Sequence, residues 1–301
     1  MSLSFPVIKN YLPLPLHKYQ TKMIRLFLFL TLFLSVVCTE ARIKGDTIKI
    51  LAVGNSFSED GVAYLDEIAA AAGVPIIVGN LYIGGCSLQR HWENIAGDRH
   101  HYVYQKNKNN QYTSTDKYSL LEGLTDEEWD YITVQQVSQD AGILPTYYPY
   151  IQDILAYLKN YATNPKVQFA FQQTWAYAQN STHGGFKNYG KDQQKMYQSI
   201  VQTTQEVIQR ENIPLVIPSG TAIQNLRAVV GDTLCRDGYH LSYALGRYTA
   251  ACAWFETLCQ KSVIGNSFFP KGISEQVARE AQKAAHAAVK QPYRVSEKKK
   301  H

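Results

Sequence analysis

Short apolar segments alternate with longer amphipathic segments along most of the chain. The short segments are rich in β-branched and aromatic residues and are bounded by glycine or polar residues, which predicts strands. Between them, apolar residues recur at three- and four-residue spacing, which predicts helices. The predicted strands cover residues 47–53, 74–82, 130–135, 167–171 and 213–217, and the predicted helices cover 58–69, 147–161, 192–210, 242–259 and 274–289.

This alternation predicts a parallel sheet with helices on both faces. Five strand–helix units fit one three-layer α/β/α domain of the flavodoxin-like kind with a five-stranded parallel sheet, which we place at residues 46–292. Such folds bind their ligands at the carboxyl ends of the strands. We therefore expect the functional residues in the loops that follow the strands.

Residues 89–128 interrupt the alternation. Two strand-like pieces, 100–104 and 111–114, flank a polar turn at 106–110. This pattern predicts an inserted hairpin near the strand ends.

The first 41 residues have the pattern of a leader. A basic residue, Arg25, precedes the apolar run 26–37, and Ala41 is a small residue at a suitable cleavage point. The run is too short to span a bilayer comfortably, so we expect an upstream extension and a secretory signal peptide, and no stable membrane span. The protein is then secreted or periplasmic. Lipidation of Cys38 is the less favoured alternative, because Val37 is a poor residue before a lipidated cysteine.

Composition and charge narrow the class of protein. Hydrophobic residues make up 45% and charged residues 18% of the chain, which is ordinary for a globular domain. The net charge is +5, but Arg294 and the three lysines 298–300 lie in the last eight positions. The rest is almost neutral, which excludes a nucleic-acid binder. We expect the basic tail, residues 293–301, to be disordered.

Cysteine and histidine positions give no metal pattern. Cys252 and Cys259 are seven residues apart on a predicted helix, about 10 Å along its axis, and cannot pair with each other. We expect no metal, no cofactor and no disulfide framework.

Ser56 is a candidate nucleophile, because it directly follows the first predicted strand. A serine at a strand-to-helix turn can be exposed, and the free N–H groups of the helix N-terminus can stabilise an oxyanion. Taken alone, a helix-capping role for Ser56 or Ser58 is favoured, since capping serines are far commoner than catalytic ones.

Asp237 and His240 are a candidate acid and base, three residues apart after the last predicted strand. In a turn both side chains can face one way, so that Asp237 orients His240 to accept the serine proton. The spacing is weak evidence, because Asp98 and His101 repeat it. Those two residues lie in the polar insertion, where an exposed surface is favoured.

Three blocks of sequence, in the same order, resemble those of the SGNH/GDSL hydrolases. Residues 54–58 resemble the Gly-Asp-Ser block, 84–88 resemble the second block, and 237–240 resemble the last block with its Asp-x-x-His. Together with the glutamine pair 135–136, they resemble an uncharacterised bacterial branch, domain-of-unknown-function family 4886. The resemblance extends from about residue 48 to residue 259.

The resemblance implies roles for particular residues. Ser56 is then the nucleophile, His240 the base and Asp237 its orienting acid. The N–H groups of Ser56 and Gly85 then form the oxyanion hole.

Two positions depart from the superfamily pattern. Asn55 stands where the first block has aspartate, and the asparagine of the third block is absent. Carbohydrate esterases of the superfamily can carry glutamine at the latter place. The resemblance therefore favours Gln136 as the third oxyanion donor, with Gln135 as the alternative.

The expected function is that of a serine esterase. It removes a small acyl group, such as acetyl, from an oligosaccharide or a related small-molecule ester through an acyl-enzyme. Trp92 and Trp175 follow predicted site segments and offer rings that can stack on a sugar. For Trp175, core packing under the loop 180–188 is an equal alternative.

Two other classes of protein stay open. One is a catalytically weak carbohydrate-binding relative, because a fold does not by itself imply chemistry. The other is an α/β-hydrolase, which shares the Ser, Asp, His order. It is disfavoured because residues 54–58 lack the second glycine of the nucleophile elbow.

Overall fold

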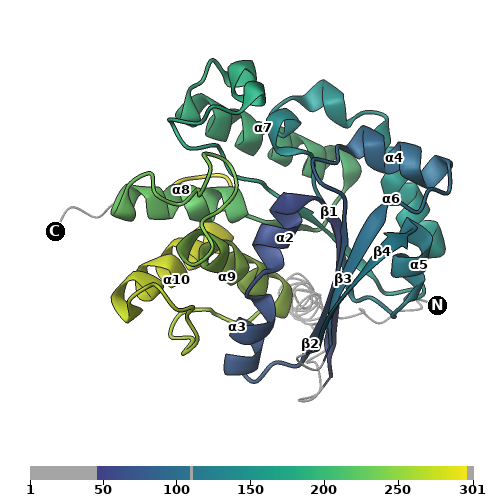
Figure 1. Ribbon diagram of the computed structural model, residues 1–301, viewed down its shortest axis with the longest axis horizontal. Helices are drawn as coiled ribbons and strands as arrows, with labels where there is room; N and C mark the ends of the chain where they lie inside the picture. Colours follow the sequence, from purple (N-terminus) through teal and green to yellow (C-terminus); the bar gives the residue numbers. More distant parts are fainter. Residues whose placement is uncertain (1–45, 109–110, 297–301) are drawn as a thin grey trace, which may run out of the picture. The chain divides into compact units, whose positions relative to one another are not determined.

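The computed structural model describes residues 46–108 and 111–296. The predicted leader, residues 1–41 with Cys38, lies outside the described residues. The strands of the described chain are β1 (Ile48–Gly54), β2 (Ile76–Tyr82), β3 (Tyr102–Lys108), β4 (Gln111–Tyr118), β5 (Tyr131–Val134), β6 (Gln168–Gln172) and β7 (Leu215–Ile217). They form one sheet in the order β4-β3-β2-β1-β5-β6-β7 (Figure 1).

Five of these strands are parallel and lie in the order β2-β1-β5-β6-β7. Numbered along the chain, this is the 2-1-3-4-5 order of flavodoxin-like folds. The predicted fold class is therefore confirmed. The carboxyl ends of β1 and β5 are neighbours, so the loops that begin at Asn55 and Gln135 start side by side.

Helices cover both faces of the sheet. In the described residues they are α2 (Ser56–Val62), α3 (Leu65–Ala71), α4 (Leu88–Ala96), α5 (Leu120–Thr125), α6 (Tyr150–Tyr161), α7 (Gln193–Glu211), α8 (Ser219–Val230), α9 (Leu245–Cys259) and α10 (Glu275–Lys290). Helices α4, α5 and α8 were not predicted from the sequence. Helix α8 is buried at every position from Ser219 to Arg227, so it lacks the amphipathic period that identifies a surface helix.

Two hydrophobic cores lie on opposite faces of the sheet, because successive side chains of a strand point to opposite sides. Ile50 and Ala52 of β1 belong to the core formed with α2, α3, α8, α9 and α10. Leu51 and Val53 belong to the core formed with α4, α5 and α6. Figure 1 shows these two groups of helices on either side of the strands. The domain is therefore the predicted three-layer arrangement.

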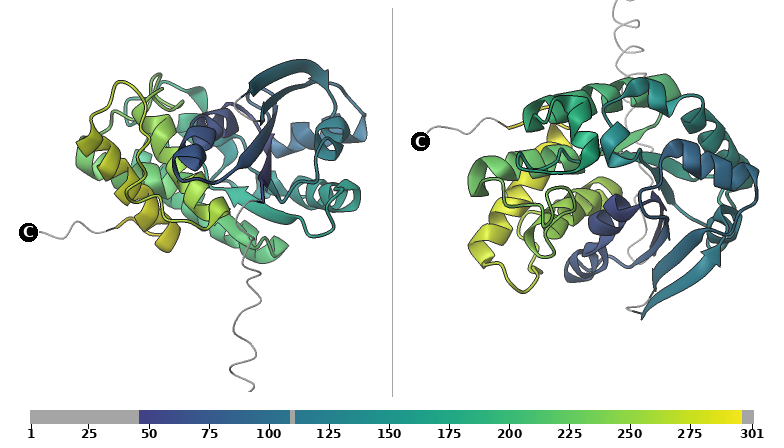
Figure 2. Two further views of the ribbon diagram at one scale, coloured as in Figure 1. Left: turned by 90° about the horizontal axis from the view of Figure 1, so that it is seen from below. Right: turned by 45° about the horizontal axis from the view of Figure 1, so that its top comes forward.

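The predicted hairpin, β3 and β4, is part of the sheet and is longer than expected. Strand β3 pairs antiparallel with β2 and extends the sheet at its edge (Figure 2). Lys106 and Lys108, predicted to lie in the turn, belong to β3, and both contact Glu127, at 2.7 and 2.6 Å. Burial raises the pKa of Glu127, but hydrogen bonds from Lys106, Lys108 and Lys49 lower it to about 2. These ion pairs explain why such polar residues continue the strand.

The ordered domain extends beyond its predicted boundary at residue 292. Val295 packs against the core, and the backbone N–H of Ser296 donates a hydrogen bond to Asn225 Oδ1 at 2.8 Å. The prediction of a disordered tail from residue 293 is thus corrected for residues 293–296. Residues 297–301 lie outside the described residues.

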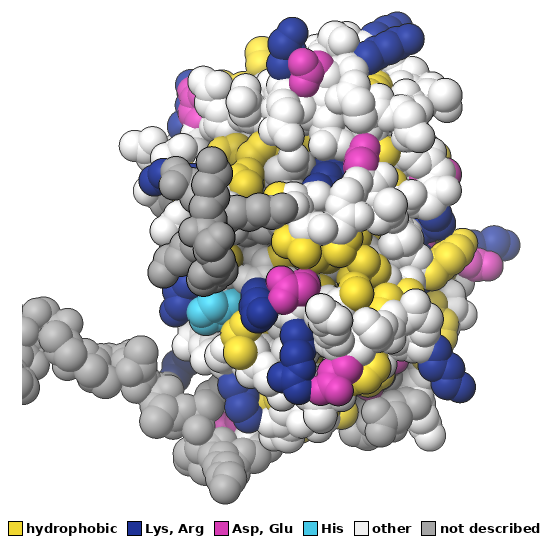
Figure 3. Space-filling view, turned by 90° about the vertical axis from the view of Figure 1, so that its left-hand side faces the viewer, with side chains coloured by type: hydrophobic (Ala, Val, Ile, Leu, Met, Phe, Trp, Pro, Cys, Tyr) yellow, Lys and Arg dark blue, Asp and Glu magenta, His cyan; other side chains and the backbone are white. Residues whose placement is uncertain are grey.

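Basic side chains on the face that carries α8 and α10 are dispersed among acidic and uncharged ones (Figure 3). No helix within residues 46–108 and 111–296 is long and apolar enough to cross a membrane.

Candidate active site

Ser56 is the first residue of α2 and follows β1 after a single residue, Asn55. Both neighbours, Asn55 and Phe57, are buried, whereas Ser56 is partly exposed. The strand end and the helix start thus hold this serine at the carboxyl edge of the sheet with its hydroxyl accessible. Asp237 and His240 lie in the loop between α8 and α9.

The structure brings these three residues together in one hydrogen-bonded chain. Ser56 Oγ lies 2.8 Å from His240 Nε2, and His240 Nδ1 lies 2.7 Å from Asp237 Oδ2. The second carboxylate oxygen, Asp237 Oδ1, accepts the backbone N–H of His240 at 2.8 Å. A carboxylate on Nδ1 leaves Nε2 to accept a proton from the serine hydroxyl, which is the arrangement of a serine nucleophile and its base.

The loop of Asp237 and His240 has little freedom. The N–H of Arg236 donates to the carbonyl of His240 at 2.9 Å, and Cys235 forms a β-bridge with Leu241. Gly238 has φ +89, and a Cβ atom there would lie 3.0 Å from Ser181 Cα. Only glycine fits this close approach in the left-handed region.

Asp60 connects that loop to the helix of the nucleophile. It is fully buried on α2, and its carboxylate accepts from Arg236 Nη1 at 3.1 Å and from Arg247 Nε at 2.7 Å. It also accepts the backbone N–H of Leu241 at 2.8 Å. One buried carboxylate thus binds Arg236, which precedes Asp237, and Leu241, which follows His240. Asp60 could not be identified from the sequence, because its partners lie far along the chain.

Asn55, which departs from the superfamily pattern, has a clear structural role. Its Oδ1 accepts the N–H of Phe57 at 2.9 Å, which caps α2, and also accepts Gln135 Nε2 at 2.9 Å. Its Nδ2 donates to the carbonyl of Cys86 at 2.9 Å. A carboxylate could not make this last bond, because it has no N–H donor. Asparagine therefore joins the start of α2 to the loop after β2.

The structure does not bring Gln136 to the site, which corrects the expectation for its position. The side chain is buried, and its Oε1 accepts the N–H groups of Leu88 and Val137 at 3.0 and 2.8 Å. Its Nε2 donates to the carbonyl of Thr146 at 3.0 Å. The amide is thus fully used in joining three loops. Gln135, the alternative, is also buried and donates to Asn55.

A pocket of about 230 Å³ opens at Ser56 and His240. Gly84 and Gly85 form one part of its lining, and Gly85 has φ +60. Within the described chain, nothing accepts a hydrogen bond from the N–H of Ser56 or Gly85. These two N–H groups are the candidate oxyanion donors. From the turn after β5, Ser138 and Gln139 also line the pocket.

His183 is a pocket residue that the sequence analysis missed. It lies between β6 and α7, and its ring contacts Tyr239, which in turn contacts the ring of His240, with centroid separations of 4.7 and 4.1 Å. Burial and nearby His240 lower the pKa of His183, and the opposing effect of Asp237 is smaller. No spacing in the sequence relates His183 to the Asp237 loop, so only the fold reveals it.

The two tryptophans proposed as sugar platforms do not line this pocket. Trp175 is fully buried and stacks on Phe57, with ring centroids 4.1 Å apart. Its indole N–H donates to the carbonyl of Tyr239 at 2.7 Å. Trp92 packs against the core that includes α4 and α6. For Trp175, the core alternative is the correct one.

The second Asp-x-x-His pair, Asp98 and His101, does not approach a serine in this way. Asp98 and His101 are exposed, and neither lines the pocket of Ser56. The neighbouring His100 contacts Glu122 at 3.2 Å. The second Asp-x-x-His spacing is therefore part of an exposed surface, as its polar surroundings indicated.

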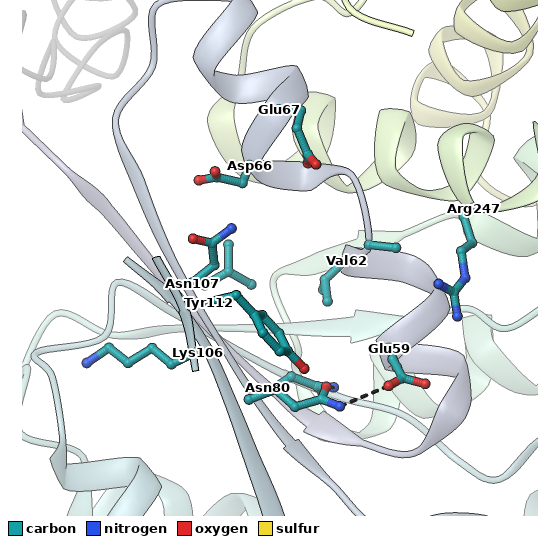
Figure 4. Close-up of a pocket in the computed structure, with 12 residues that line it drawn as sticks. Glu59, Val62, Asp66, Glu67, Asn80, Lys106, Asn107, Tyr112 and Arg247 are labelled. Atoms are coloured by element: carbon teal, nitrogen blue, oxygen red, sulfur yellow. Dashed lines mark hydrogen bonds between the residues drawn. The ribbon is translucent and has the colours of Figure 1, made fainter. Parts of the chain in front are cut away.

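A larger pocket of about 350 Å³ lies between α2, α3 and the hairpin. Figure 4 shows Asp66 and Glu67 of α3 on one side and Asn107 and Tyr112 of the hairpin on the other. It contains no serine or histidine, so it lacks a nucleophile and base. Residues 46–108 and 111–296 contain no group of three or more His, Cys, Asp or Glu that could hold a metal ion.

The fold and the site together define a flavodoxin-like α/β protein with a serine, histidine and aspartate joined at the carboxyl edge of its sheet. The chain belongs to the DUF4886 family, a domain of unknown function, which matches residues 49–288. The predicted family is therefore confirmed.

Solved structures include a relative in the same family. A DUF4886 family protein from Bacteroides uniformis is 45% identical, with a TM-score of 0.82, over 84% of this chain and 98% of that one. A putative SGNH hydrolase from Slackia heliotrinireducens is 22% identical, with a TM-score of 0.48, over 70% and 99% of the two chains. A variant of Axe2, an acetyl-xylooligosaccharide esterase from Geobacillus stearothermophilus, is 13% identical, with a TM-score of 0.49, over 72% and 96%. No curated protein matches the chain.

Proposed function

We propose that this protein is a serine esterase that removes a small acyl group, with acetyl as the first candidate, from a carbohydrate or a related ester. The observation that carries the proposal is the chain of contacts from Ser56 Oγ through His240 to Asp237, with distances of 2.8 and 2.7 Å. Ordinary helix capping does not account for Ser56, because Asn55 already caps α2.

In the proposed reaction, His240 Nε2 takes the proton of Ser56 as Oγ attacks the ester carbonyl. Asp237 holds the proton on Nδ1 and stabilises the imidazolium. The N–H groups of Ser56 and Gly85 donate to the oxyanion. The tetrahedral intermediate then expels the alcohol, which receives the proton from His240, and leaves an acyl group on Ser56. Water, deprotonated by His240, releases the acid in a second round.

Two features support a small acyl group. The pocket holds only about 230 Å³, and its lining is largely of glycine, polar and ring-bearing residues, with Val137 as its single aliphatic side chain among the described residues. A long acyl chain needs a continuous aliphatic slot. The sugar part of the proposal no longer rests on Trp92 or Trp175.

A labelling experiment tests the proposal. We expect a fluorophosphonate probe to modify Ser56, identified by peptide mass spectrometry, and the protein to release p-nitrophenol from p-nitrophenyl acetate. Ser56→Ala should abolish both signals. Ser262→Ala, at an exposed serine outside the pocket, is the matched control and should retain both. Wild-type turnover in a folded Ser56→Ala protein would overturn the assignment.

The second candidate is a catalytically weak carbohydrate-binding protein. The departures from the superfamily pattern at Asn55 and at the third block motivate it, since neither glutamine of the pair lines the pocket of Ser56. Binding of an acetylated sugar without release of acetate, by a protein that the fluorophosphonate does not label, would favour this candidate.

We also propose export. The basic residue, apolar run and small residues before position 42 support a leader that is cleaved after Ala41. Sequencing the N-terminus of the protein from a periplasmic or medium fraction tests this. An intact leader on a cytosolic protein would contradict it, and a lipid on Cys38 would favour the lipoprotein alternative.

A further inference from the structure

His183 presents one unused donor to the site. The backbone N–H of Gly185 donates to His183 Nδ1 at 3.0 Å, so this nitrogen carries no proton. The neutral ring therefore has its proton on Nε2. Nε2 has no partner among the described residues, and the ring lines the pocket of Ser56.

The orientation of this ring is fixed on several sides. It meets Tyr177 and Tyr239 edge-on, with centroid separations of 4.9 and 4.7 Å. Tyr177 is itself held by a hydrogen bond with Ser138 Oγ at 2.8 Å. The lowered pKa of His183 favours the neutral ring near pH 7. A donor held by packing in this way is suited to select one hydrogen-bonding partner.

The position of His183 indicates which part of a substrate it meets. His240 must reach the leaving oxygen of an ester, so the alcohol part lies on the His240 side of Ser56. His183 lies on this same side, since Tyr239 contacts both histidine rings. The oxyanion candidates, Ser56 and Gly85, belong to the other loops of the pocket.

We propose that His183 is a specificity-determining residue whose Nε2–H donates a hydrogen bond to a hydroxyl oxygen in the alcohol part of the ester. The site then prefers esters of polyols, sugars included, over esters of simple alcohols. This inference rests on the proposed esterase function.

Two esters that differ only in hydroxyl groups test it. We would measure kcat/KM for 2,3-dihydroxypropyl acetate and for propyl acetate by pH-stat titration at pH 7.5. The wild-type protein should prefer the dihydroxy ester. In His183→Phe, which keeps a ring but has no N–H, the ratio of the two kcat/KM values should fall by about threefold or more, within the range of one lost neutral hydrogen bond.

A second variant distinguishes the loss of the proposed bond to substrate from the loss of the bond between His183 and the Gly185 N–H. His183→Asn keeps an oxygen that can accept the Gly185 N–H, as asparagine does in such turns, but its shorter amide does not reach as far into the pocket. We expect the same fall in the ratio, so this variant decides the question if His183→Phe does not fold. His101→Phe, at an exposed histidine outside the pocket, is the matched control and should leave the ratio unchanged.

The outcomes distinguish this inference from the proposed function. A wild-type protein that hydrolyses both esters without preferring the dihydroxy ester would overturn the role of His183 and leave the esterase intact. An unchanged ratio in both His183 variants would do the same. A wild-type protein that hydrolyses neither ester, nor p-nitrophenyl acetate, would overturn the proposed function and this inference together.

Discussion

The carboxylate of Asp60 accepts the backbone N–H of Leu241 at 2.8 Å and so connects the helix of the proposed nucleophile to the loop of the proposed base. Asp60 follows Ser56 by one helical turn on α2, and Leu241 directly follows His240. Two arginines, Arg236 and Arg247, complete the surroundings of the carboxylate. The distance between Ser56 and His240 therefore depends on a charged group that touches neither of them.

Asp60→Asn should weaken both the fold and the proposed activity. Asparagine keeps the volume and one acceptor oxygen, but leaves two arginines without their carboxylate. Loss of one partner of a buried ion pair costs about 3–5 kcal/mol of unfolding free energy, and a displacement of about 1 Å at the site costs about 10²-fold in kcat. Urea unfolding and p-nitrophenyl acetate turnover measure the two effects.

The control for that change is Glu67→Gln on α3, which removes an exposed carboxylate. It should alter neither quantity appreciably. The rate of fluorophosphonate labelling of Ser56 should fall with kcat in Asp60→Asn under conditions where the variant is folded. Wild-type labelling and turnover in this variant would show that Asp60 does not position the site.

Asp237→Asn should lower kcat by about 10⁴-fold, the loss found when an orienting carboxylate of this kind becomes an amide. Burial raises the pKa of Asp237, but hydrogen bonds from the ring and N–H of His240 and from the N–H of Tyr239 lower it overall. Its carboxylate therefore stabilises the fold above its ordinary pKa of about 4, and this stabilisation is lost as the pH falls further.

Unfolding experiments from pH 2 to pH 7 check the sign of this effect. The stability difference between wild type and Asp237→Asn should shrink as the pH falls below about pH 4. A difference that does not shrink below about pH 4 would contradict the assigned contacts of Asp237.

The sequence was sufficient to predict what depends on local pattern. Strand β1 and the short link to Ser56 are predictable because apolar runs, glycine and polar caps are local signals. The Asp237 and His240 pair was predictable because both residues lie in one loop. Helix α8 was not, because burial on all sides removes its period.

What the sequence could not predict is which distant side chains meet. Gln136 and Gln135 are adjacent, yet one joins Leu88 to Thr146 and the other contacts Asn55. His183 and Asp60 reach the site only through folding of segments that lie far apart in the chain. Such contacts depend on the packing of the whole domain rather than on spacing within a motif.

Changing each of the two glutamines to alanine should therefore have different effects on stability and on kcat. Gln136→Ala leaves the buried N–H groups of Leu88 and Val137 without an acceptor, and an unsatisfied buried group costs about 1–3 kcal/mol. Gln135→Ala removes a bond to Asn55, which immediately precedes the proposed nucleophile. We expect the larger loss of stability in Gln136→Ala and the larger loss of kcat in Gln135→Ala.

Thermal unfolding and p-nitrophenyl acetate kinetics on Gln136→Ala and Gln135→Ala test which variant loses more stability and which loses more kcat. A fall in kcat of about 10²–10³ in a fully stable Gln136→Ala protein is the result expected of an oxyanion donor. That result would return Gln136 to the site, against its contacts with Leu88 and Thr146.

Trp175→Ala should destabilise the fold without changing substrate preference. The indole is fully buried, stacks on Phe57 and donates to the carbonyl of Tyr239 at 2.7 Å. Truncation of such a side chain costs about 3–5 kcal/mol of unfolding free energy, which urea unfolding measures. Because Trp175 contacts Phe57, which directly follows the proposed nucleophile, kcat/KM should fall alike for 2,3-dihydroxypropyl acetate and propyl acetate. Trp175→Phe, which keeps a stacked ring, should lose less stability. A loss confined to the dihydroxy ester, at wild-type stability, would instead restore Trp175 as a surface for sugar binding.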